Sequence, residues 1–313
     1  MQNYRFKLEK YHGPSSKHTC PGCGCKRRFV RYIDTEERIK FPYYVGKCDR
    51  INNCGYHYPP KQYFKEHPNE QHDCNDNVRL NVNGRHRSRP LPSFVSLDIM
   101  KKSMCNYEDN NFVIFLHSLF DDATVNRILQ RYHIGTSRKW KGATVFWQVD
   151  TGGRVHHGKV MVYDATTGHR SSNCFSTAEC ILHLPDFNLQ QCFFGEHLLR
   201  DANKPVALVE SEKSAIIASE IMPQFHWLAS GGSSGCLNSR MHILSGRNVV
   251  MFPDLKCLEK WRTQAVKMKL AGTKVEVSDY LENHASSEEL SMGLDIADFI
   301  INEIRERQIL NKK

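Results

Sequence analysis

Short apolar runs separated by amphipathic segments dominate the C-terminal third of the chain. Four of these runs have the length of buried strands, at 205–209, 225–229, 248–252 and 273–277. Helical segments follow the first run, from about 210, and the third run, through Leu270. Strands that alternate with helices predict βαβ units and a parallel sheet with flanking helices. Ligands bind such sheets at the carboxyl ends of the strands, which is where Glu210 and Asp254 fall.

A mixed pattern of helices and strands precedes this part, over 93–203. Residues 112–120 carry an apolar helical face, and Asp121 has the position of an N-cap for a helix that ends near Tyr132. Residues 144–149 and 155–163 read as strands joined by the turn Asp-Thr-Gly-Gly at 150–153. We therefore expect an α+β lobe, in which Lys159 points into a groove or is simply solvated.

The cysteines near the N-terminus have metal-ligand spacing. Two knuckles, 20–25 and 48–54, flank two expected strands at 28–33 and 41–45, which join around 34–37. Zinc prefers four tetrahedral thiolate or imidazole ligands, so we predict a zinc ribbon over 1–65. The predicted ligands are Cys20, Cys23, Cys48 and Cys54. Cys25 and His57 are the alternatives, because five residues separate the second pair of cysteines.

The excess positive charge of the chain lies in the same N-terminal region. Residues 1–90 hold 18 Lys and Arg against 9 Asp and Glu, whereas the other 223 residues hold 25 of each. A basic module beside a neutral body favours a polyanionic partner, here single-stranded DNA, over a merely soluble surface. Its basic residues alternate with aromatic ones that could stack on bases. The expected nucleic-acid contacts in this module are Arg28, Arg31, Tyr32, Lys47 and Arg50. The polar segment 66–92 reads as a linker.

The composition bears on the cellular location of the protein. The 313 residues contain no run of about 20 apolar residues, and the N-terminus lacks the apolar core of a secretory signal. We expect a soluble, cytoplasmic protein without membrane contact, in which the 12 cysteines are reduced. No Gly-x-x-x-x-Gly-Lys-Ser/Thr motif is present, so any unwinding of DNA would need a helicase partner.

The C-terminal residues resemble a known domain. An apolar strand that ends in Glu210, a glycine-rich turn at 230–235 and a later strand that ends in Asp254 resemble the TOPRIM domain of bacterial-type primases, topoisomerases and some nucleases. The order of zinc ribbon, linker, mixed lobe with Tyr-His-Ile-Gly at 132–135, and TOPRIM-like domain over 204–313 is similar to bacterial and phage primases. It looks most like the zinc-plus-TOPRIM proteins of bacterial mobile elements.

The resemblance implies roles for particular residues. Glu210 would be the motif glutamate, a metal ligand or acid/base, and Glu212 the second glutamate of the phage-type variant. Asp254 matches the first aspartate of an Asp-x-Asp motif, but Lys256 stands in the second position. Asp295 is a third candidate ligand, so Mg²⁺ would be held by Glu210, Asp254 and Asp295. A purely structural interpretation of Glu210 and Glu212 is an acidic first helical turn.

The function implied by this resemblance is that of a primase-like protein that binds single-stranded DNA. It would carry out Mg²⁺-dependent nucleotidyl or phosphoryl transfer during replication of a mobile element. The catalytic candidates are Glu210, Glu212, Asp254 and Lys256, and Lys159 and Lys213 are expected to contact nucleic acid. Because Lys256 replaces a carboxylate, a catalytically degenerate TOPRIM module that only binds DNA is the main alternative, and a TOPRIM nuclease is another.

Overall fold

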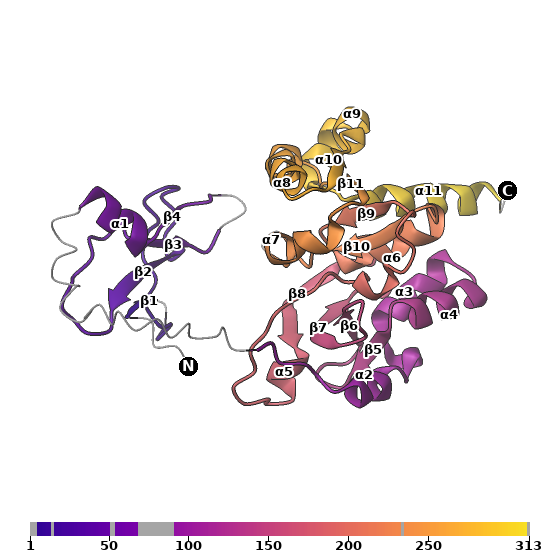
Figure 1. Ribbon diagram of the computed structural model, residues 1–313, viewed down its shortest axis with the longest axis horizontal. Helices are drawn as coiled ribbons and strands as arrows, with labels where there is room; N and C mark the ends of the chain where they lie inside the picture. The colour runs from indigo at the N-terminus through magenta and orange to yellow at the C-terminus, as the bar shows by residue number, and fades with distance from the viewer. Residues whose placement is uncertain (1–4, 14–15, 51–53, 68–90, 233–234, 312–313) are drawn as a thin grey trace. The chain divides into compact units, whose positions relative to one another are not determined.

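A computed structural model describes residues 5–13, 16–50, 54–67, 91–232 and 235–311. Contacts within the chain divide it into two compact units, Met1–Ser88 and Arg89–Lys313, which are taken separately here (Figure 1). The predicted linker, 66–92, lies almost entirely outside the described residues. Among the helices of the described residues, none has both the length and the apolar character of a membrane span.

The first unit is built on a small antiparallel sheet in the order β1-β2-β3-β4. Its elements are β1 (Phe6–Leu8), β2 (Phe29–Asp34), β3 (Gly46–Cys48), β4 (His57–Tyr58) and the short helix α1 (Pro60–Glu66). One cluster of its core joins Cys20, Phe29 and Cys48, and a second packs Val45 against Tyr63 and Phe64 of α1. Aromatic and cysteine side chains thus form most of the interior.

The first predicted strand of this unit is confirmed as β2, but the second, 41–45, is wrong. The partner of β2 is β3, with Phe29 opposite Cys48, and the preceding residues form a turn in which the Val45 N–H bonds the carbonyl of Pro42 at 3.0 Å. Proline has no N–H for a strand ladder, which favours a turn here. Buried Asp34 shapes the bend after β2, because its carboxylate accepts the backbone N–H groups of Glu36, Arg38 and Ile39 at 3.0–3.1 Å.

The second unit begins with an antiparallel sheet in the order β5-β6-β7-β8. Its strands are β5 (Ile134–Ser137), β6 (Ala143–Val149), β7 (Val155–Tyr163) and β8 (Arg170–Thr177). The predicted hairpin is confirmed as β6 and β7, and the Gly153 N–H closes its turn on the carbonyl of Asp150 at 2.9 Å. Helices α2 (Leu97–Ser103), α3 (Asn111–Leu119), α4 (Asp122–Arg131) and α5 (Ala178–Ile181) accompany this sheet, as do the 3₁₀ helices η3 (Tyr107–Asp109) and η4 (Glu196–Leu198).

The two predicted helices of this lobe are α3 and α4. Asp121 caps α4 as expected, since its carboxylate accepts the Thr124 N–H at 2.8 Å. The apolar face of α3 is fully buried, with Phe112 and Phe115 at 0% exposure. The amphipathic pattern therefore placed these helices correctly against the sheet.

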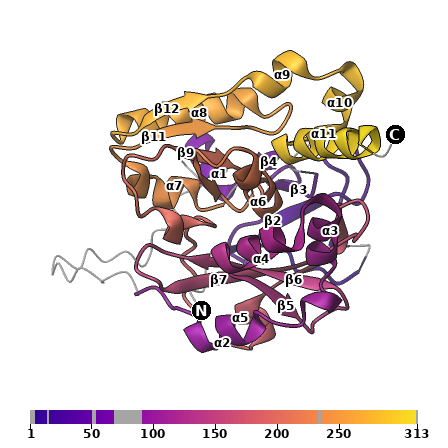
Figure 2. The same ribbon diagram turned by 90° about the vertical axis from the view of Figure 1, so that its right-hand side faces the viewer.

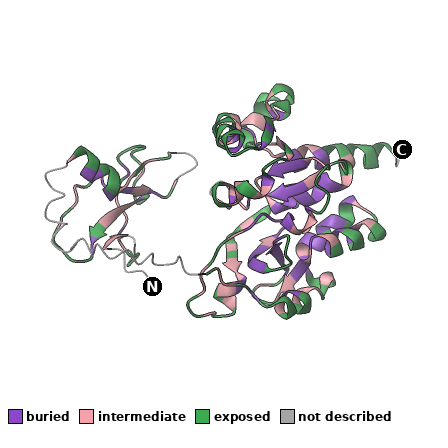
Figure 3. Cartoon of the chain, viewed as in Figure 1, coloured by how far each residue is buried: buried purple, intermediate pink, exposed green. Residues whose placement is uncertain are grey.

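A parallel sheet in the order β10-β9-β11-β12 follows, and it confirms all four predicted strands. The strands are β9 (Val206–Val209), β10 (His226–Ala229), β11 (Asn248–Met251) and β12 (Lys274–Val277). The accompanying helices are α6 (Glu212–Ile221), α7 (Leu237–Arg240), η5 (Met241–Leu244), α8 (Leu258–Leu270), α9 (Tyr280–His284), α10 (Ser287–Met292) and α11 (Ile296–Leu310). Every residue of the central strand β9 is buried (Figure 3), as expected of a strand covered on both faces.

One hydrophobic core joins the two sheets of the second unit. It includes Phe112 and Phe146 from the antiparallel lobe together with Ile216 of α6 and Ile300 of α11. The C-terminal helix α11 lies beside α3 of the antiparallel lobe (Figure 2). Its Arg305 also donates to the carbonyl of Thr166 in that lobe at 2.8 Å. The two lobes thus share one core, and side chains from both line a single pocket.

Candidate functional site

The four predicted zinc ligands converge in the first unit. The sulfur atoms of Cys20, Cys23, Cys48 and Cys54 all lie within 4.8 Å of one another, and in the described part of the chain no other group of three or more His, Cys, Asp or Glu side chains comes this close. The Sγ atoms of Cys20 and Cys54 are 3.7 Å apart. Tetrahedral zinc with Zn–S bonds of about 2.3 Å requires S–S distances of about 3.8 Å, so the donor set fits zinc.

The two alternative ligands are directed elsewhere. The Cys25 sulfur accepts a bond from the Arg50 guanidinium at 2.7 Å, and the His57 ring is 3.0 Å from the Tyr32 hydroxyl. A hydrogen bond from the Cys25 backbone lowers the pKa of the Cys23 thiol to about 6, whereas burial raises that of Cys48 to about 12, so Cys48 needs a bound cation to become a thiolate. The first unit therefore has the geometry of a zinc ribbon, in which the four clustered cysteines Cys20, Cys23, Cys48 and Cys54 would hold the ion.

A basic groove lies on the zinc ribbon. Its lining, which we call the ribbon groove, consists of Lys17, His18, Thr19, Cys20, Pro21, Lys26, Arg27, Arg31 and Tyr43. Tyr43 is 67% exposed, and the Nε atom of Arg31 is buried without a hydrogen-bond partner in the described part of the chain. Among the predicted nucleic-acid contacts, only Arg31 belongs to this lining. Arg50 and Tyr32 are engaged with Cys25 and His57, and Arg28 and Lys47 lie outside the groove.

In the second unit, Glu210 and Asp254 follow adjacent parallel strands. Leu208 of β9 pairs with Met251 of β11, and the Phe252 N–H bonds the Leu208 carbonyl at 2.9 Å, so both carboxylates lie at the carboxyl edge of one sheet. The Glu210 carbonyl accepts the N–H groups of Gly231 and Gly232, each at 3.1 Å. These two residues have φ values of +82° and +117°, which explains why this turn uses glycine.

Asp254 is the electrostatic centre of an acidic cluster. Burial, together with the negative charges of Asp295, Glu210 and Asp298, raises its pKa to about 8 against the opposing effect of Lys213. Within the described residues, no hydrogen bond or ion pair is recorded for the side chains of Glu210 and Asp254. These two carboxylates can thus accept a cation without giving up a protein partner.

The other two members of the acidic cluster, Asp295 and Asp298, form hydrogen bonds that hold the start of α11. The Asp295 carboxylate caps α11 by accepting the Asp298 N–H at 3.1 Å, and the Asp298 carboxylate accepts the Asp295 N–H at 3.0 Å. Asp295 also accepts the Ser214 hydroxyl at 2.6 Å, and Asp298 accepts the Lys213 ammonium at 2.8 Å. Burial lowers the pKa of Lys213, but Asp295 and Asp298 outweigh it, so the net shift is upward and the amine stays charged.

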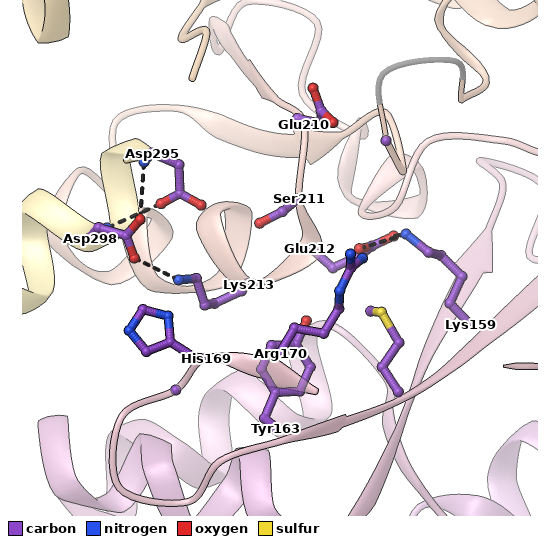
Figure 4. Close-up of a pocket in the computed structure, with 13 residues that line it drawn as sticks. Lys159, Tyr163, His169, Arg170, Glu210, Ser211, Glu212, Lys213, Asp295 and Asp298 are labelled. Carbon is purple, nitrogen blue, oxygen red and sulfur yellow. Dashed lines mark hydrogen bonds and ion pairs between the residues drawn. The ribbon is translucent and has the colours of Figure 1, made fainter. Parts of the chain in front are cut away.

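A pocket of about 210 Å³ lies between these carboxylates and the antiparallel sheet (Figure 4). Its lining is Lys159, Met161, Tyr163, Gly168, His169, Arg170, Glu210, Ser211, Glu212, Lys213, Gly232, Asp295 and Asp298. Of the predicted magnesium ligands, Glu210 and Asp295 line the pocket. Asp254 does not line it, but the charges of Glu210 and Asp295 raise the pKa of Asp254. One wall is therefore acidic, and His169 and Arg170 bring potential cations to the opposite wall.

Glu212 and Lys159 neutralise each other in this pocket. The Lys159 ammonium lies 2.8 and 3.0 Å from the two carboxylate oxygens of Glu212, and it also donates to the Gly231 carbonyl at 3.3 Å. Both side chains are buried. The structure thus shows Glu212 as the partner of a lysine, and both groups are engaged with each other instead of being free for metal or nucleic acid.

Lys256 lies outside the pocket. It has a positive φ of +69° in the turn before α8, is exposed, and donates its ammonium to the carbonyl of Ser291 at 3.0 Å. Its charge is thus directed at α10 and not into the pocket. The pocket also contains residues that sequence reasoning had not selected, namely His169, Arg170 and Asp298. Only Asp298 had a signal, because it belongs to the Gly-x-Asp-x-x-Asp stretch at 293–298.

Comparisons with known proteins give two matches to family models. Residues 110–255 match a family described as a domain of unknown function, DUF6371, and residues 4–69 match a family described as a zinc beta-ribbon finger. Among curated proteins, none is significantly similar to the chain. The second match covers the zinc ribbon with its four clustered cysteines.

The chain is also similar to solved primase structures, at low identity. The RNA polymerase domain of Mycobacterium tuberculosis primase DnaG is 13% identical, with a TM-score of 0.39, over 63% of this chain and 80% of that one. The E. coli primase catalytic core is 10% identical, with a TM-score of 0.41, over 67% and 82%. The primase fragment of the bacteriophage T7 primase-helicase is 13% identical, with a TM-score of 0.38, over 88% and 98%.

Proposed function

We propose that this protein is a primase-like nucleic-acid protein whose C-terminal part, 204–313, is a TOPRIM-like domain. In this proposal the zinc ribbon binds single-stranded DNA template, and the pocket of the second unit carries out Mg²⁺-dependent nucleotidyl or phosphoryl transfer. The setting would be the replication of a mobile element, with a helicase supplied by another protein.

The observation that carries the proposal is the arrangement of charge around Asp254. A carboxylate whose pKa is raised to about 8 by burial and by three neighbouring carboxylates is unfavourable without a counter-ion. An ion pair with Lys213 satisfies Asp298, and a hydrogen bond from Ser214 satisfies part of Asp295, but Glu210 and Asp254 have no such side-chain partner among the described residues. Such a cluster at the carboxyl edge of a parallel sheet suits a hard divalent cation with oxygen ligands.

The oxygen donors suit magnesium in kind, but the carboxylates of Glu210, Asp254 and Asp295 do not all come within 4.8 Å of one another in the described structure. Because magnesium usually keeps several water ligands, these residues would hold it partly through water. When bound, the ion would polarise a phosphoryl oxygen and stabilise the charge that develops on it during transfer. Of these carboxylates, Glu210 and Asp295 line the pocket, where a substrate phosphate would have access to them.

The chain's own residues would bind and orient the substrate. Arg170 and His169, on the wall opposite the carboxylates, would bind phosphate oxygens, for which the planar guanidinium of Arg170 is well suited. The buried pair of Lys159 and Glu212 would fix the floor of the pocket and hold the Gly231 turn in place. Together these groups would position a phosphate beside the acidic cluster, and positioning is a main component of phosphoryl-transfer catalysis.

Purified full-length protein tests this function. With single-stranded template, the four NTPs and Mg²⁺, we expect short oligonucleotide products that disappear in Glu210→Gln. Glu306→Gln is the matched control, because Glu306 is exposed on α11 outside the pocket, and we expect it to retain activity. Absence of products from the wild-type protein under all template and nucleotide conditions would contradict the proposed transferase.

A catalytically degenerate module that only binds DNA is the second candidate. Lys256 in the position of a motif aspartate, and the neutralised Lys159–Glu212 pair, favour this alternative. Retention of DNA without any product would select it, whereas Mg²⁺-dependent cleavage of the template would select the TOPRIM nuclease. The three outcomes are separated by one denaturing gel and one binding measurement.

A further inference from the structure

We propose that Phe175 is a stacking platform for a nucleobase, so that the pocket of the second unit takes a whole nucleotide and not only a phosphate. Arg170 binds the phosphate at the other end of this site. The inference rests on the proposed function, because it concerns the ligand of the same pocket. It adds an aromatic contact on β8, outside the zinc ribbon, where the sequence predicts base stacking.

The pairing of β7 with β8 places Phe175 on the face of the sheet that forms the pocket. Phe175 lies opposite Met161 of β7. Arg170, at the start of β8, lies opposite Tyr163. Side chains of residues directly opposite each other in an antiparallel pair lie on the same face. Met161, Tyr163 and Arg170 all line the pocket, so Phe175 belongs to the pocket face of the sheet.

An irregularity in β8 brings Phe175 and Arg170 to the same face. They are five positions apart on β8, whereas the residues opposite them on β7 are two positions apart, because the register shifts between the two pairs. In a regular strand an odd separation puts two side chains on opposite faces. Bulges re-aim side chains in this way and are frequent beside active sites. Two residues of β7 span about 7 Å, which is the separation of Phe175 and Arg170 along the sheet.

The Phe175 ring is available to a flat ligand. The residue is 56% exposed, and within the described part of the chain it belongs to none of the buried clusters of the second unit. Strand β8 is also an edge strand, with β7 on one side only. A single exposed apolar side chain is common on protein surfaces. This one is distinguished by its place on the same face as the cationic group of the pocket.

Arg170 supplies the end of the site that binds an anion. Among the described residues, no hydrogen bond or ion pair is recorded for its guanidinium, which suits phosphate oxygens. Figure 4 shows the side chains of Arg170 and Tyr163 next to each other in the pocket. The nearby Glu212 is neutralised by Lys159, which reduces its repulsion of a phosphate. One sugar ring separates the base of a nucleotide from its 5′ phosphate, so a nucleotide along β8 reaches both Phe175 and Arg170.

Binding measurements on the full-length protein, with zinc retained and Mg²⁺ present, test the inference. The probes are ATP and inorganic triphosphate, which lacks a base. We expect Phe175→Ala to weaken ATP binding about 5- to 150-fold, the range for loss of one base–aromatic contact, and to leave triphosphate binding unchanged. Arg170→Ala should weaken both, because the phosphate contact is common to them. Leu189→Ala is the matched control, an exposed apolar residue outside the pocket, and should bind as the wild type does.

Two further variants at the same position separate stacking from a simple apolar contact. Phe175→Leu keeps an apolar side chain without an aromatic face, so it should lose most of the affinity that Phe175→Ala loses. Phe175→Trp should retain the affinity, and the ligand that stacks should quench the emission of the added tryptophan. Quenching by ATP assigns the base to a free nucleotide. Quenching by a single-stranded oligonucleotide, but not by its abasic counterpart, assigns it to the DNA strand and supports the stacking site equally.

The outcomes separate this inference from the proposed function. Unchanged ATP affinity in Phe175→Ala, with no base-dependent quenching in Phe175→Trp, would overturn the inference and leave the transferase standing, because product formation is measured separately. Equal loss of ATP and triphosphate affinity in Phe175→Ala would also overturn it, since the defect would not depend on the base. Base-dependent binding by a protein that forms no products would support the stacking site and overturn the transferase. Failure of the wild type to bind any of the probes would overturn both.

Discussion

The Lys159 ammonium of β7 lies 2.8 Å from the Glu212 carboxylate at the start of α6, and both side chains are buried. This ion pair links the antiparallel sheet to the first turn that follows the central strand of the parallel sheet. Because the same ammonium reaches the Gly231 carbonyl at 3.3 Å, the pair also fixes the glycine turn beside Glu210. A residue expected to be catalytic and one expected to bind nucleic acid thus stabilise the floor of the pocket together.

Removing one member of this pair should be more damaging than removing both. Glu212→Gln or Lys159→Met leaves a buried charge without its partner, so we expect a loss of about 3–5 kcal/mol in the free energy of unfolding. The double variant Lys159→Met with Glu212→Met should lose less than the worse single variant. Chemical denaturation measures this cycle. Glu259→Gln, at the exposed pair with Arg262, should change stability by less than about 1 kcal/mol, and additive effects at the buried pair would contradict the prediction.

Asp254 should make stability depend on pH when no divalent cation is added. Its folded pKa of about 8 lies above the ordinary value of 3.8, so the native state binds this proton more tightly than the unfolded state. Stability should therefore fall as pH rises from about 5 to 8, at up to about 1.4 kcal/mol per pH unit. Thermal unfolding at several pH values, with zinc retained, measures the slope.

Two controls identify Asp254 as the source of that slope. Asp254→Asn should flatten it, and millimolar Mg²⁺ should flatten it in the wild type, because the ion compensates the carboxylate charge. A slope that persists unchanged in Asp254→Asn would show that another group is responsible.

The zinc content should depend on the four clustered cysteines and not on the other cysteines of the first unit. We expect about one zinc per chain in the wild type and in Cys25→Ser, because Cys25 lies outside the cluster and faces Arg50. Cys48→Ser should lose most of the zinc and unfold the ribbon. Elemental analysis with circular dichroism checks both variants. Equal loss of zinc in the two would refute this ligand set.

The ribbon groove should contribute to DNA binding in two separable ways. Arg31→Ala should weaken binding of single-stranded DNA and lower the salt slope by about 0.7, the value for one phosphate contact. Tyr43→Ala should cost about 1–3 kcal/mol of stacking with an unchanged salt slope. Fluorescence anisotropy across a salt series measures both. Arg38→Ala, outside the groove, is the control, and an effect as large as that of Arg31→Ala would argue against the groove.

Structural features that depend on short stretches of sequence were predicted correctly in most cases. The strand and helix periodicities located β6, β7, β9 to β12, α3 and α4, and the knuckle spacing selected the four cysteines that converge. The expected strand at 41–45 failed because a proline turn shifts the pairing to Gly46–Cys48. Strands β1, β4, β5 and β8 are short or polar, so their apolar signal was too weak to find.

The sequence by itself determined which segments form strands and helices, where the metal-binding thiols lie, and that Glu210 and Asp254 follow parallel strands, because periodicity and spacing act over a few residues. Only the tertiary structure decided which charges meet. It paired Lys159 with Glu212 and Lys213 with Asp298, turned Lys256 toward Ser291, and brought Arg170 to the pocket. The partners in these three contacts are 35 to 85 residues apart in the sequence. Electrostatic interactions depend on distance in space, which the local sequence does not specify.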